Sequence, residues 1–299
     1  MKLSRNRVGE LFIVAEALLW AAFPIVTKVT YKFLPPIHTL AYATLAAAVF
    51  FGILFIFNKG WRELSKWEAW KPILLSTFII AILFYAFFFW GLQTTTAGNA
   101  SIISQMELWF SFIFFGLILR KEKYTRAALL GALLMFVGVM FVLFDGFSKV
   151  SKGDFLIFFA TMIPPLGNHF QQTARKFVST TTLLFVRNIL GGIFLLIFSS
   201  LIETTPTIQN FSAALPLLLL NGVALWGISK IFWVEGIHRI TVAQGLSISA
   251  ITPIVTLLYV YLLSGEIPQL PQVFGLLPIL AGGYLIVNKK FLRNEEILD

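Results

Sequence analysis

The chain has no cysteine, and only 12% of its 299 residues are charged. The absence of cysteine excludes disulfide bonds, thiolate metal sites and a cysteine nucleophile. The three histidines, His38, His169 and His238, lack the spacing of a metal site, and neither a P-loop nor a nucleophile elbow is present. We therefore predict that the protein is not an enzyme, holds no metal or cofactor, and does not bind ATP to drive a process.

Hydrophobic residues are abundant instead: they make up 58% of the chain and give a mean hydropathy of +0.85. A helix needs about 20 mainly apolar residues to cross a bilayer, whereas a membrane β-barrel shows alternating segments of about 10 residues. Ten segments have helix-spanning length: 8–31, 36–57, 71–92, 97–119, 125–144, 154–174, 181–202, 213–235, 241–263 and 271–288. The sequence therefore predicts an all-α integral membrane protein with ten transmembrane helices, surrounded by the lipid bilayer.

The net charge of +9 is unevenly distributed between the two sides of the predicted membrane. If the N-terminus lies inside, 17 of the 23 Lys and Arg residues fall on the cytoplasmic side, and only Lys32, Lys149 and Lys152 fall outside. Cytoplasmic loops are normally enriched in Lys and Arg. We therefore expect a multi-pass protein of the plasma membrane, which in a bacterium is the inner membrane. Both termini are expected in the cytoplasm, and the charge does not indicate nucleic-acid binding.

The two halves of the chain resemble each other at an offset of 144 or 145 residues. The matched glycine pairs are Gly9 and Gly153, Gly91 and Gly236, Gly131 and Gly275, and Gly138 and Gly282. Each half contains five predicted spans, and an odd number of crossings turns the second half upside down. We therefore predict two inverted five-helix repeats, 1–148 and 149–299. Inverted repeats are typical of carriers that bind substrate near the middle of the membrane and open to each side in turn.

A stripe of small and polar residues in the fourth predicted span has a copy in the ninth. Ala100, Ser104, Glu107 and Ser111 match Gly245, Ser249, Thr252 and Thr256. A spacing of three or four residues places each set on one helix face. The stripe is typical of close helix packing, or of two helices that frame a substrate cavity.

Prolines interrupt the first and sixth predicted spans at related places, Pro24 in one and Pro164 and Pro165 in the other. A proline removes a backbone hydrogen bond and kinks a helix. Paired interruptions indicate either a packing kink or a transporter binding site.

Charged residues inside predicted spans are costly and are therefore candidates for function. Glu107 lies near the centre of its span, and we expect a proton carrier, a counter-ion for a substrate amine, or a structural salt bridge to Arg187 or Lys230. Glu16 shares a helix face with Trp20, which we expect to stack on substrate, although Glu16 has the alternative of reaching the membrane interface. Lys230 is expected to meet a substrate carboxylate or to extend to the cytoplasmic surface.

Polar and aromatic residues complete the predicted substrate site. His169 follows the double proline and is either a hydrogen-bonded core residue or a proton relay. Each aromatic residue has the alternative of packing against lipid. The predicted substrate-binding residues are Trp20, Pro24, Tyr85, Phe89, Ser104, Glu107, Asn168, His169, Gln172, Trp226, Lys230 and Ser249.

The order of these motifs resembles that of the drug/metabolite transporter (DMT) superfamily, in particular its EamA-type ten-helix carriers. The motifs are Trp20-Ala-Ala-Phe-Pro24-Ile-Val-Thr-Lys28 and Asn99-Ala-Ser-Ile-Ile-Ser-Gln-Met-Glu107, with Thr252-Pro253 echoing the second. Members usually carry Glu-Pro in the fourth and ninth spans. Here Glu107 precedes a leucine and Pro253 follows a threonine, so each copy retains half of the motif.

The resemblance implies a secondary transporter that works by alternating access, similar to the YddG-like amino-acid exporters. We therefore predict export of small metabolites, above all amino acids, including aromatic or hydrophobic ones. Efflux of lipophilic cations or drugs and a non-transporting membrane protein are the alternatives. The sequence leaves the oligomeric state open and is compatible with a monomer.

Overall fold

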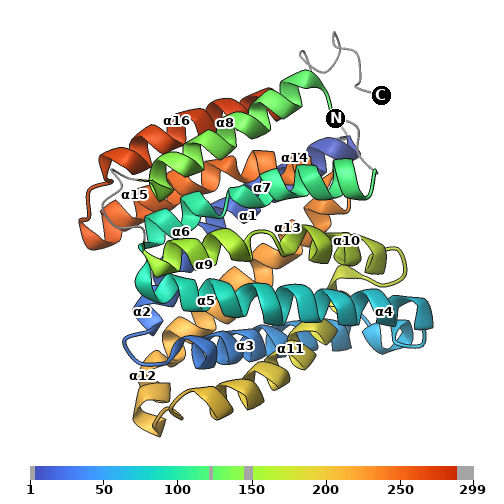
Figure 1. Cartoon of the computed structure of the whole chain (residues 1–299). Helices are drawn as coiled ribbons and strands as arrows, with labels where there is room; N and C mark the ends of the chain where they lie inside the picture. The colour runs from blue at the N-terminus through green and yellow to red at the C-terminus, as the bar shows by residue number, and fades with distance from the viewer. Residues whose placement is uncertain (1–3, 121–123, 145–150, 288–299) are drawn as a thin grey trace.

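The protein is described by a computed structural model that covers residues 4–120, 124–144 and 151–287. In this part the chain forms helices that run roughly side by side (Figure 1). Eight helical stretches of the described residues are long and apolar enough to cross a membrane. The sixth predicted span is present as two helices, α9 and α10, separated just before the double proline, and the tenth is α16. The prediction of an all-α membrane protein is confirmed.

The predicted spans consist of single helices or of consecutive helices that continue one another. In the first half these are α1 (Arg5–Trp20) with α2 (Phe23–Thr30), α3 (Pro36–Phe57), α4 (Trp67–Ser76) with a π-helical stretch (Thr77–Phe84) and α5 (Tyr85–Thr94), α6 (Ala97–Ile103) with α7 (Met106–Ser111) and π-helical Phe112–Ile118, and α8 (Arg126–Leu143). In the second half they are α9 (Lys152–Ala160) with α10 (Pro164–Ala174), α11 (Thr180–Ile202), α12 (Ile208–Leu219) with π-helical Leu220–Ile228 and α13 (Ser229–Ile237), α14 (Val242–Ile248) with a 3-10 turn (Ser249–Ile251) and α15 (Thr252–Ser264), and α16 (Leu270–Val287). The predicted boundary between residues 148 and 149 lies outside the described residues.

Breaks in the helices occur at corresponding places in the two halves. Helix α2 begins one residue before Pro24, and α10 begins at Pro164, so both restart with a proline in their first turn. A second proline pair, Pro72 and Pro216, is spaced by the repeat offset and lies inside α4 and α12. Each precedes a π-helical stretch, because a proline interrupts the regular hydrogen-bond pattern of its helix. The sequence analysis found the first pair and missed the second.

The fourth and ninth spans also begin and break at matched residues. Thr96 caps the start of α6 and Thr241 the start of α14, and each side chain accepts a hydrogen bond from a backbone N–H three residues on. Ser104 and Ser249 terminate the same two helices. The polar stripe predicted from the sequence therefore contains the point at which both helices are interrupted.

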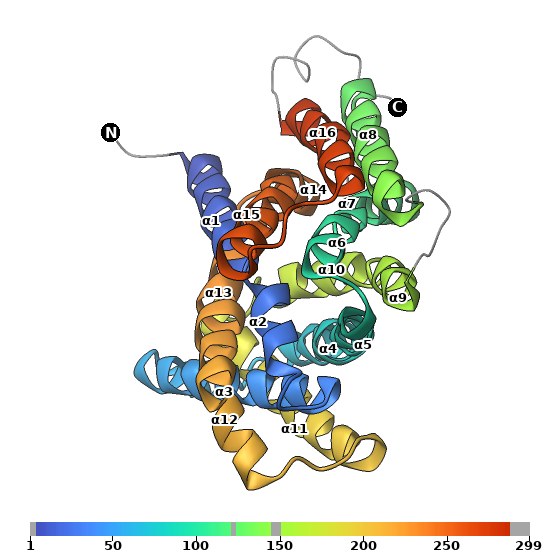
Figure 2. The same cartoon turned by 90° about the vertical axis from the view of Figure 1, so that its left-hand side faces the viewer.

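Equivalent helices of the two halves pack antiparallel, as inverted repeats require. A Cβ placed on Gly131 of α8 would lie 2.6 Å from the carbonyl oxygen of Gly282 in α16, and one on Gly275 would lie 2.6 Å from that of Gly138. The backbones therefore touch at both crossings, which only glycine permits. Figure 2 shows this pair at one edge of the bundle, with α3, α11 and α12 toward the other edge.

The remaining matched glycines join non-equivalent helices in a symmetric way. Gly9 of α1 faces Gly236 of α13, and Gly91 of α5 faces Gly153 of α9. Gly9 is matched by Gly153 in the repeat, and Gly236 is matched by Gly91. The two contacts are therefore equivalent and are related by the two-fold symmetry of the repeats. The glycines that revealed the repeat in the sequence are thus the points where its helices pack most closely.

The two ends of the bundle differ in charge. We call the end where Arg5, Arg175 and Arg239 lie the basic end, on the right in Figure 1, and the other end the opposite end. Between them the outer surface carries many exposed apolar side chains, including Val49, which is 66% exposed. A surface of this kind suits contact with lipid.

Candidate functional site

A cavity lies between the two halves, midway along the helices. The volume within which the centre of a water molecule fits is about 90 Å³. The lining residues from the first half are Glu16, Trp20, Ile80, Phe84, Tyr85, Phe88, Ser104, Gln105 and Glu107, and those from the second half are Pro164, Asn168, Gln171, Arg187, Lys230, Trp233, Leu246, Ser249 and Thr252. We call this the central cavity. Because each half supplies part of the wall, movement of one half against the other would change its shape.

One side of the central cavity carries a buried ion pair. The Nζ atom of Lys230 on α13 donates to Oε1 of Glu16 on α1 at 2.9 Å, and it lies 3.3 Å from the ring centroid of Trp20. Glu16 is 3% exposed and Lys230 is 7% exposed, so neither side chain reaches the interface or the cytoplasmic surface. The ammonium group is compensated by a carboxylate and by an aromatic face.

A chain of hydrogen bonds crosses the other side of the cavity. Glu107 accepts from the Asn168 amide at 2.8 Å, and the Asn168 oxygen accepts from Gln171 at 2.9 Å. The Gln171 oxygen in turn accepts from NH1 of Arg187 at 2.5 Å. A carboxylate and a guanidinium are therefore joined through two amides rather than by a direct ion pair. The alternative prediction of a Glu107 salt bridge to Arg187 or Lys230 is not realised among the described residues.

Aromatic rings form the wall toward the opposite end. The ring of Tyr85 lies 4.2 Å from that of Trp226, and Trp20 stacks on Phe23 at 4.1 Å between centroids. Phe23, Phe89 and Trp226 are completely buried. Stacked and edge-on arrangements are the favoured contacts between aromatic rings. These rings separate the central cavity from the opposite end.

Hydrogen bonds between helices reinforce this closed side. The Lys28 ammonium donates to the backbone carbonyls of Leu92 and Thr95 at the end of α5, and the Tyr31 hydroxyl donates to that of Phe89. Asn221 donates to the Thr27 hydroxyl at 3.1 Å. These bonds link α2 to α5 and to the eighth span.

Hydrogen bonds between α10 and α13 cross the wall toward the basic end. Trp233 donates to the Asn168 oxygen at 3.2 Å, and Gln172 donates to the backbone carbonyl of Ile237 at 2.9 Å, so α10 and α13 are joined at two points. Beyond them lies a depression of about 580 Å³ that His169 and Gln172 help to line. The predicted residues His169 and Gln172 therefore face this depression and not the central cavity.

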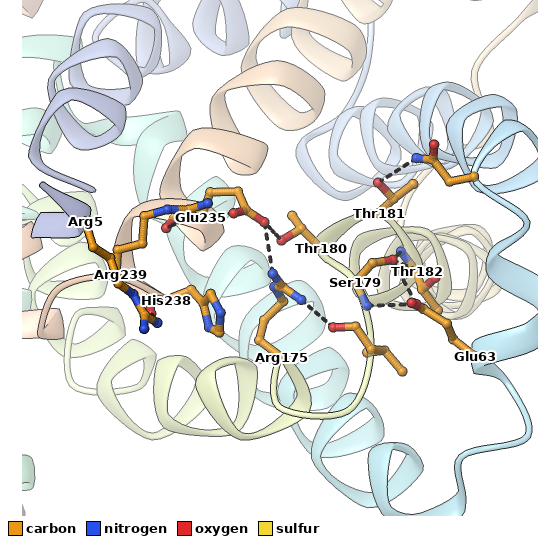
Figure 3. A network of polar contacts seen from close by, with 12 residues as sticks. Arg5, Glu63, Arg175, Ser179, Thr180, Thr181, Thr182, Glu235, His238 and Arg239 are labelled. Atoms are coloured by element: carbon orange, nitrogen blue, oxygen red, sulfur yellow. Dashed lines mark hydrogen bonds and ion pairs between the residues drawn. The ribbon is translucent and has the colours of Figure 1, made fainter. Parts of the chain in front are cut away.

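A polar network ties the helix ends together at the basic end (Figure 3). The Glu235 carboxylate accepts from Arg175, Arg239 and the Thr180 hydroxyl. Glu63 accepts from the backbone N–H of Ser179 at 2.7 Å and from its hydroxyl at 2.8 Å, which caps the start of α11. The network fixes the α10–α11 connection against α13 and against the segment that follows α3.

The fold shifts the pKa values of Glu63 and His238, which lie in this network outside the membrane-spanning segments. Burial alone would raise the pKa of Glu63, but the hydrogen bonds from Ser179 outweigh it and leave that pKa lowered. Burial, and then the positive charge of Arg175, lowers the pKa of His238. Folding therefore favours an ionised Glu63 and a neutral His238.

The family is shown by comparison with known proteins. A model of the EamA-like transporter family matches residues 7–144 and again residues 151–288. The chain belongs to the EamA-like transporter family. It is 26% identical to the uncharacterized transporter YyaM of Bacillus subtilis, over 85% of each chain. It is also 26% identical to an uncharacterized transporter of Archaeoglobus fulgidus, over 95% of this chain and 99% of that one. A protein of known crystal structure superposes with a TM-score of 0.72 at 16% identity, covering 95% and 98% of the two chains.

Seven of the predicted substrate-binding residues line the central cavity of this EamA-like transporter: Trp20, Tyr85, Ser104, Glu107, Asn168, Lys230 and Ser249. Phe89 and Trp226 are completely buried within the aromatic wall, and Pro24 is buried in α2, which continues from the cavity toward the opposite end; none of the three is among the lining residues. Whether any of them binds substrate remains a prediction.

The sequence analysis did not select several lining residues, among them Gln171 and Arg187. Gln171 follows Asn168 by three residues, so helical spacing placed it on the same face. Arg187 was visible as a charge inside a span. The sequence offered no signal for its neighbours, which come from other helices.

Proposed function

We propose that this EamA-like transporter exports small metabolites, above all amino acids and including aromatic or hydrophobic ones, by secondary transport. The observation that supports this substrate class is a cavity that holds two opposite charges, Glu107 and Arg187, without an ion-pair partner for either among the described residues. An amino acid carries a matching ammonium and carboxylate. The rings of Phe84, Tyr85 and Phe88 offer an apolar wall for its side chain.

We propose further that the basic end faces the cytoplasm, as the excess of Lys and Arg favours. The wall formed by Trp233 and Gln172 is then the cytoplasmic gate, and the aromatic wall is the external gate. Opening one while the other stays closed gives alternating access. Export begins when substrate passes the two hydrogen bonds between α10 and α13.

The test is counterflow of labelled phenylalanine, leucine and alanine in proteoliposomes loaded with the same unlabelled amino acid. We expect uptake by the wild type and at least a tenfold loss in Glu107→Gln, which retains the hydrogen bond from Asn168 but removes the charge that binds ammonium. Glu68→Gln changes an exposed carboxylate outside the cavity and is the matched control. If no amino acid moves under any gradient, this substrate class is wrong.

Efflux of lipophilic cations is a second candidate, favoured by the Trp20 ring that already holds an ammonium group at 3.3 Å. Vesicles that accumulate a cationic dye but no amino acid would identify this function. We expect the opposite result.

A further inference from the structure

Arg187 stands apart from the other buried charges. It lies on α11, is 2% exposed, and uses only NH1 in a hydrogen bond, to the Gln171 oxygen. Its Nε and NH2 atoms are buried and have no hydrogen-bond partner among the described residues. Guanidinium groups inside membrane proteins are normally paired, because an uncompensated buried charge is strongly destabilising.

The acids that line the same cavity do not compensate Arg187. Glu16 is engaged by Lys230 at 2.9 Å, and Glu107 accepts from Asn168 at 2.8 Å. Gln171 contributes a neutral oxygen, which orients the guanidinium but carries no opposing charge. The wall of the central cavity therefore holds a cation with two donor atoms, Nε and NH2, that no described residue accepts from.

These two donors have a defined geometry. In a guanidinium group, the Nε and NH2 hydrogens lie on the same edge and point in parallel. That edge matches the two oxygens of a carboxylate, and such paired bonds are among the strongest hydrogen bonds that proteins make. Lys230 offers no equivalent edge, and its charge is already matched by Glu16.

We propose that Arg187 is the carboxylate-binding residue of the central cavity, and that Gln171 positions it. The inference rests on the proposed function and narrows its substrates to compounds with a carboxylate. The Nε and NH2 atoms bind the two carboxylate oxygens. The sequence had offered Lys230 for this role, with extension to the cytoplasmic surface as an equal alternative.

The test measures ligand binding to purified full-length protein in detergent by ligand-dependent thermal stabilisation. The ligands are phenylalanine, 3-phenylpropionate, which lacks the amine, and phenethylamine, which lacks the carboxylate. In Arg187→Gln we expect the affinity for both carboxylates to fall by about 10- to 100-fold, since charged hydrogen bonds are lost, while phenethylamine binding is unchanged. Asn188→Ala alters a completely buried polar neighbour outside the cavity and should bind all three ligands as the wild type does.

A second variant tests the proposal independently in case Arg187→Gln does not fold. Gln171→Glu places a carboxylate where the amide oxygen lies, 2.5 Å from NH1, and so supplies the missing counter-ion from within the protein. We expect this variant to melt at a higher temperature than the wild type without ligand, and to bind 3-phenylpropionate at least tenfold more weakly. Unchanged carboxylate affinity in both variants would overturn the proposal.

The outcomes separate this inference from the proposed function. If wild-type and Arg187→Gln proteoliposomes transport phenylalanine equally, the proposed function stands and the role of Arg187 is wrong. If no amino acid is transported but 3-phenylpropionate binds in an Arg187-dependent way, the carboxylate site stands and amino-acid export is wrong. Binding of phenethylamine without either carboxylate contradicts both.

Discussion

The ion pair between Glu16 and Lys230 predicts a large, non-additive effect of mutation on stability. Both side chains are buried and their charged atoms are 2.9 Å apart, so removing either leaves the other charge uncompensated. Loss of one partner of a buried pair typically costs about 3–5 kcal/mol. The Trp20 ring faces the ammonium in the wild type and in Glu16→Gln alike, so it does not change the difference between them. Because the introduced amide oxygen can still accept a hydrogen bond from Lys230, we expect a cost at the lower end of this range, about 3 kcal/mol.

The double variant separates this explanation from a simple loss of packing. With Glu16→Gln and Lys230→Met combined, no charge is left unpaired, and the cost should fall to about 1 kcal/mol, a coupling of at least ~2 kcal/mol. Equilibrium unfolding in detergent, followed by tryptophan fluorescence, measures the three variants against the wild type. Melting points should fall by roughly 6–12 °C in Glu16→Gln. Additive effects of the two substitutions would refute the reasoning.

Three further predictions concern packing, pH and transport. Gly131→Val should separate α8 from α16 and lower the melting point by several degrees, whereas Leu130→Val on the exposed face should not. Equal melting points of these two variants would contradict the close contact between the helices. Glu63→Gln should destabilise the protein by about 1 kcal/mol at neutral pH. Folding lowers the pKa of Glu63, so the stabilisation by this carboxylate is complete above its unfolded-state pKa of about 4.5 and is lost as pH falls through its folded-state pKa. Denaturant titrations at several pH values measure the difference in stability between variant and wild type. A difference that does not change with pH would contradict this prediction. Ser104→Trp and Ser249→Trp should each fill the central cavity and abolish counterflow while the protein still folds; normal transport by both would show that this cavity is not the substrate path.

Much of the fold was predictable because membrane burial acts on each segment separately. Apolar runs of sufficient length had to be spans. The glycines matched at the repeat offsets marked close contacts, since glycine is costly in a helix unless backbones approach. The Pro72 and Pro216 pair was equally visible and was overlooked. The π-helical stretches after these prolines were not predictable, because local hydrogen bonding there depends on the surrounding helices.

The site was only half predictable. A charge inside a span is visible in sequence, so Glu107 and Lys230 were identified as candidates. Their partners were not, because Glu16 and Lys230 are 214 residues apart and meet only where α1 packs against α13. For Lys230 the sequence left two alternatives, a substrate carboxylate or the cytoplasmic surface, and the structure instead pairs it with Glu16.

The sequence by itself determined the ten spans, the inverted repeat and the kinds of charge that the membrane interior must hold. Only the tertiary structure decided which charges compensate each other and which have no ion-pair partner among the described residues. At the repeat offsets Glu16, Glu107 and Arg187 correspond to Ala160, Thr252 and Ala43, so these charges belong to one copy only. The duplicated residues pack helices against each other, and this packing needs only the local shape of each helix. Ion pairing depends on distances between residues of different helices, and these distances are set only in the folded protein.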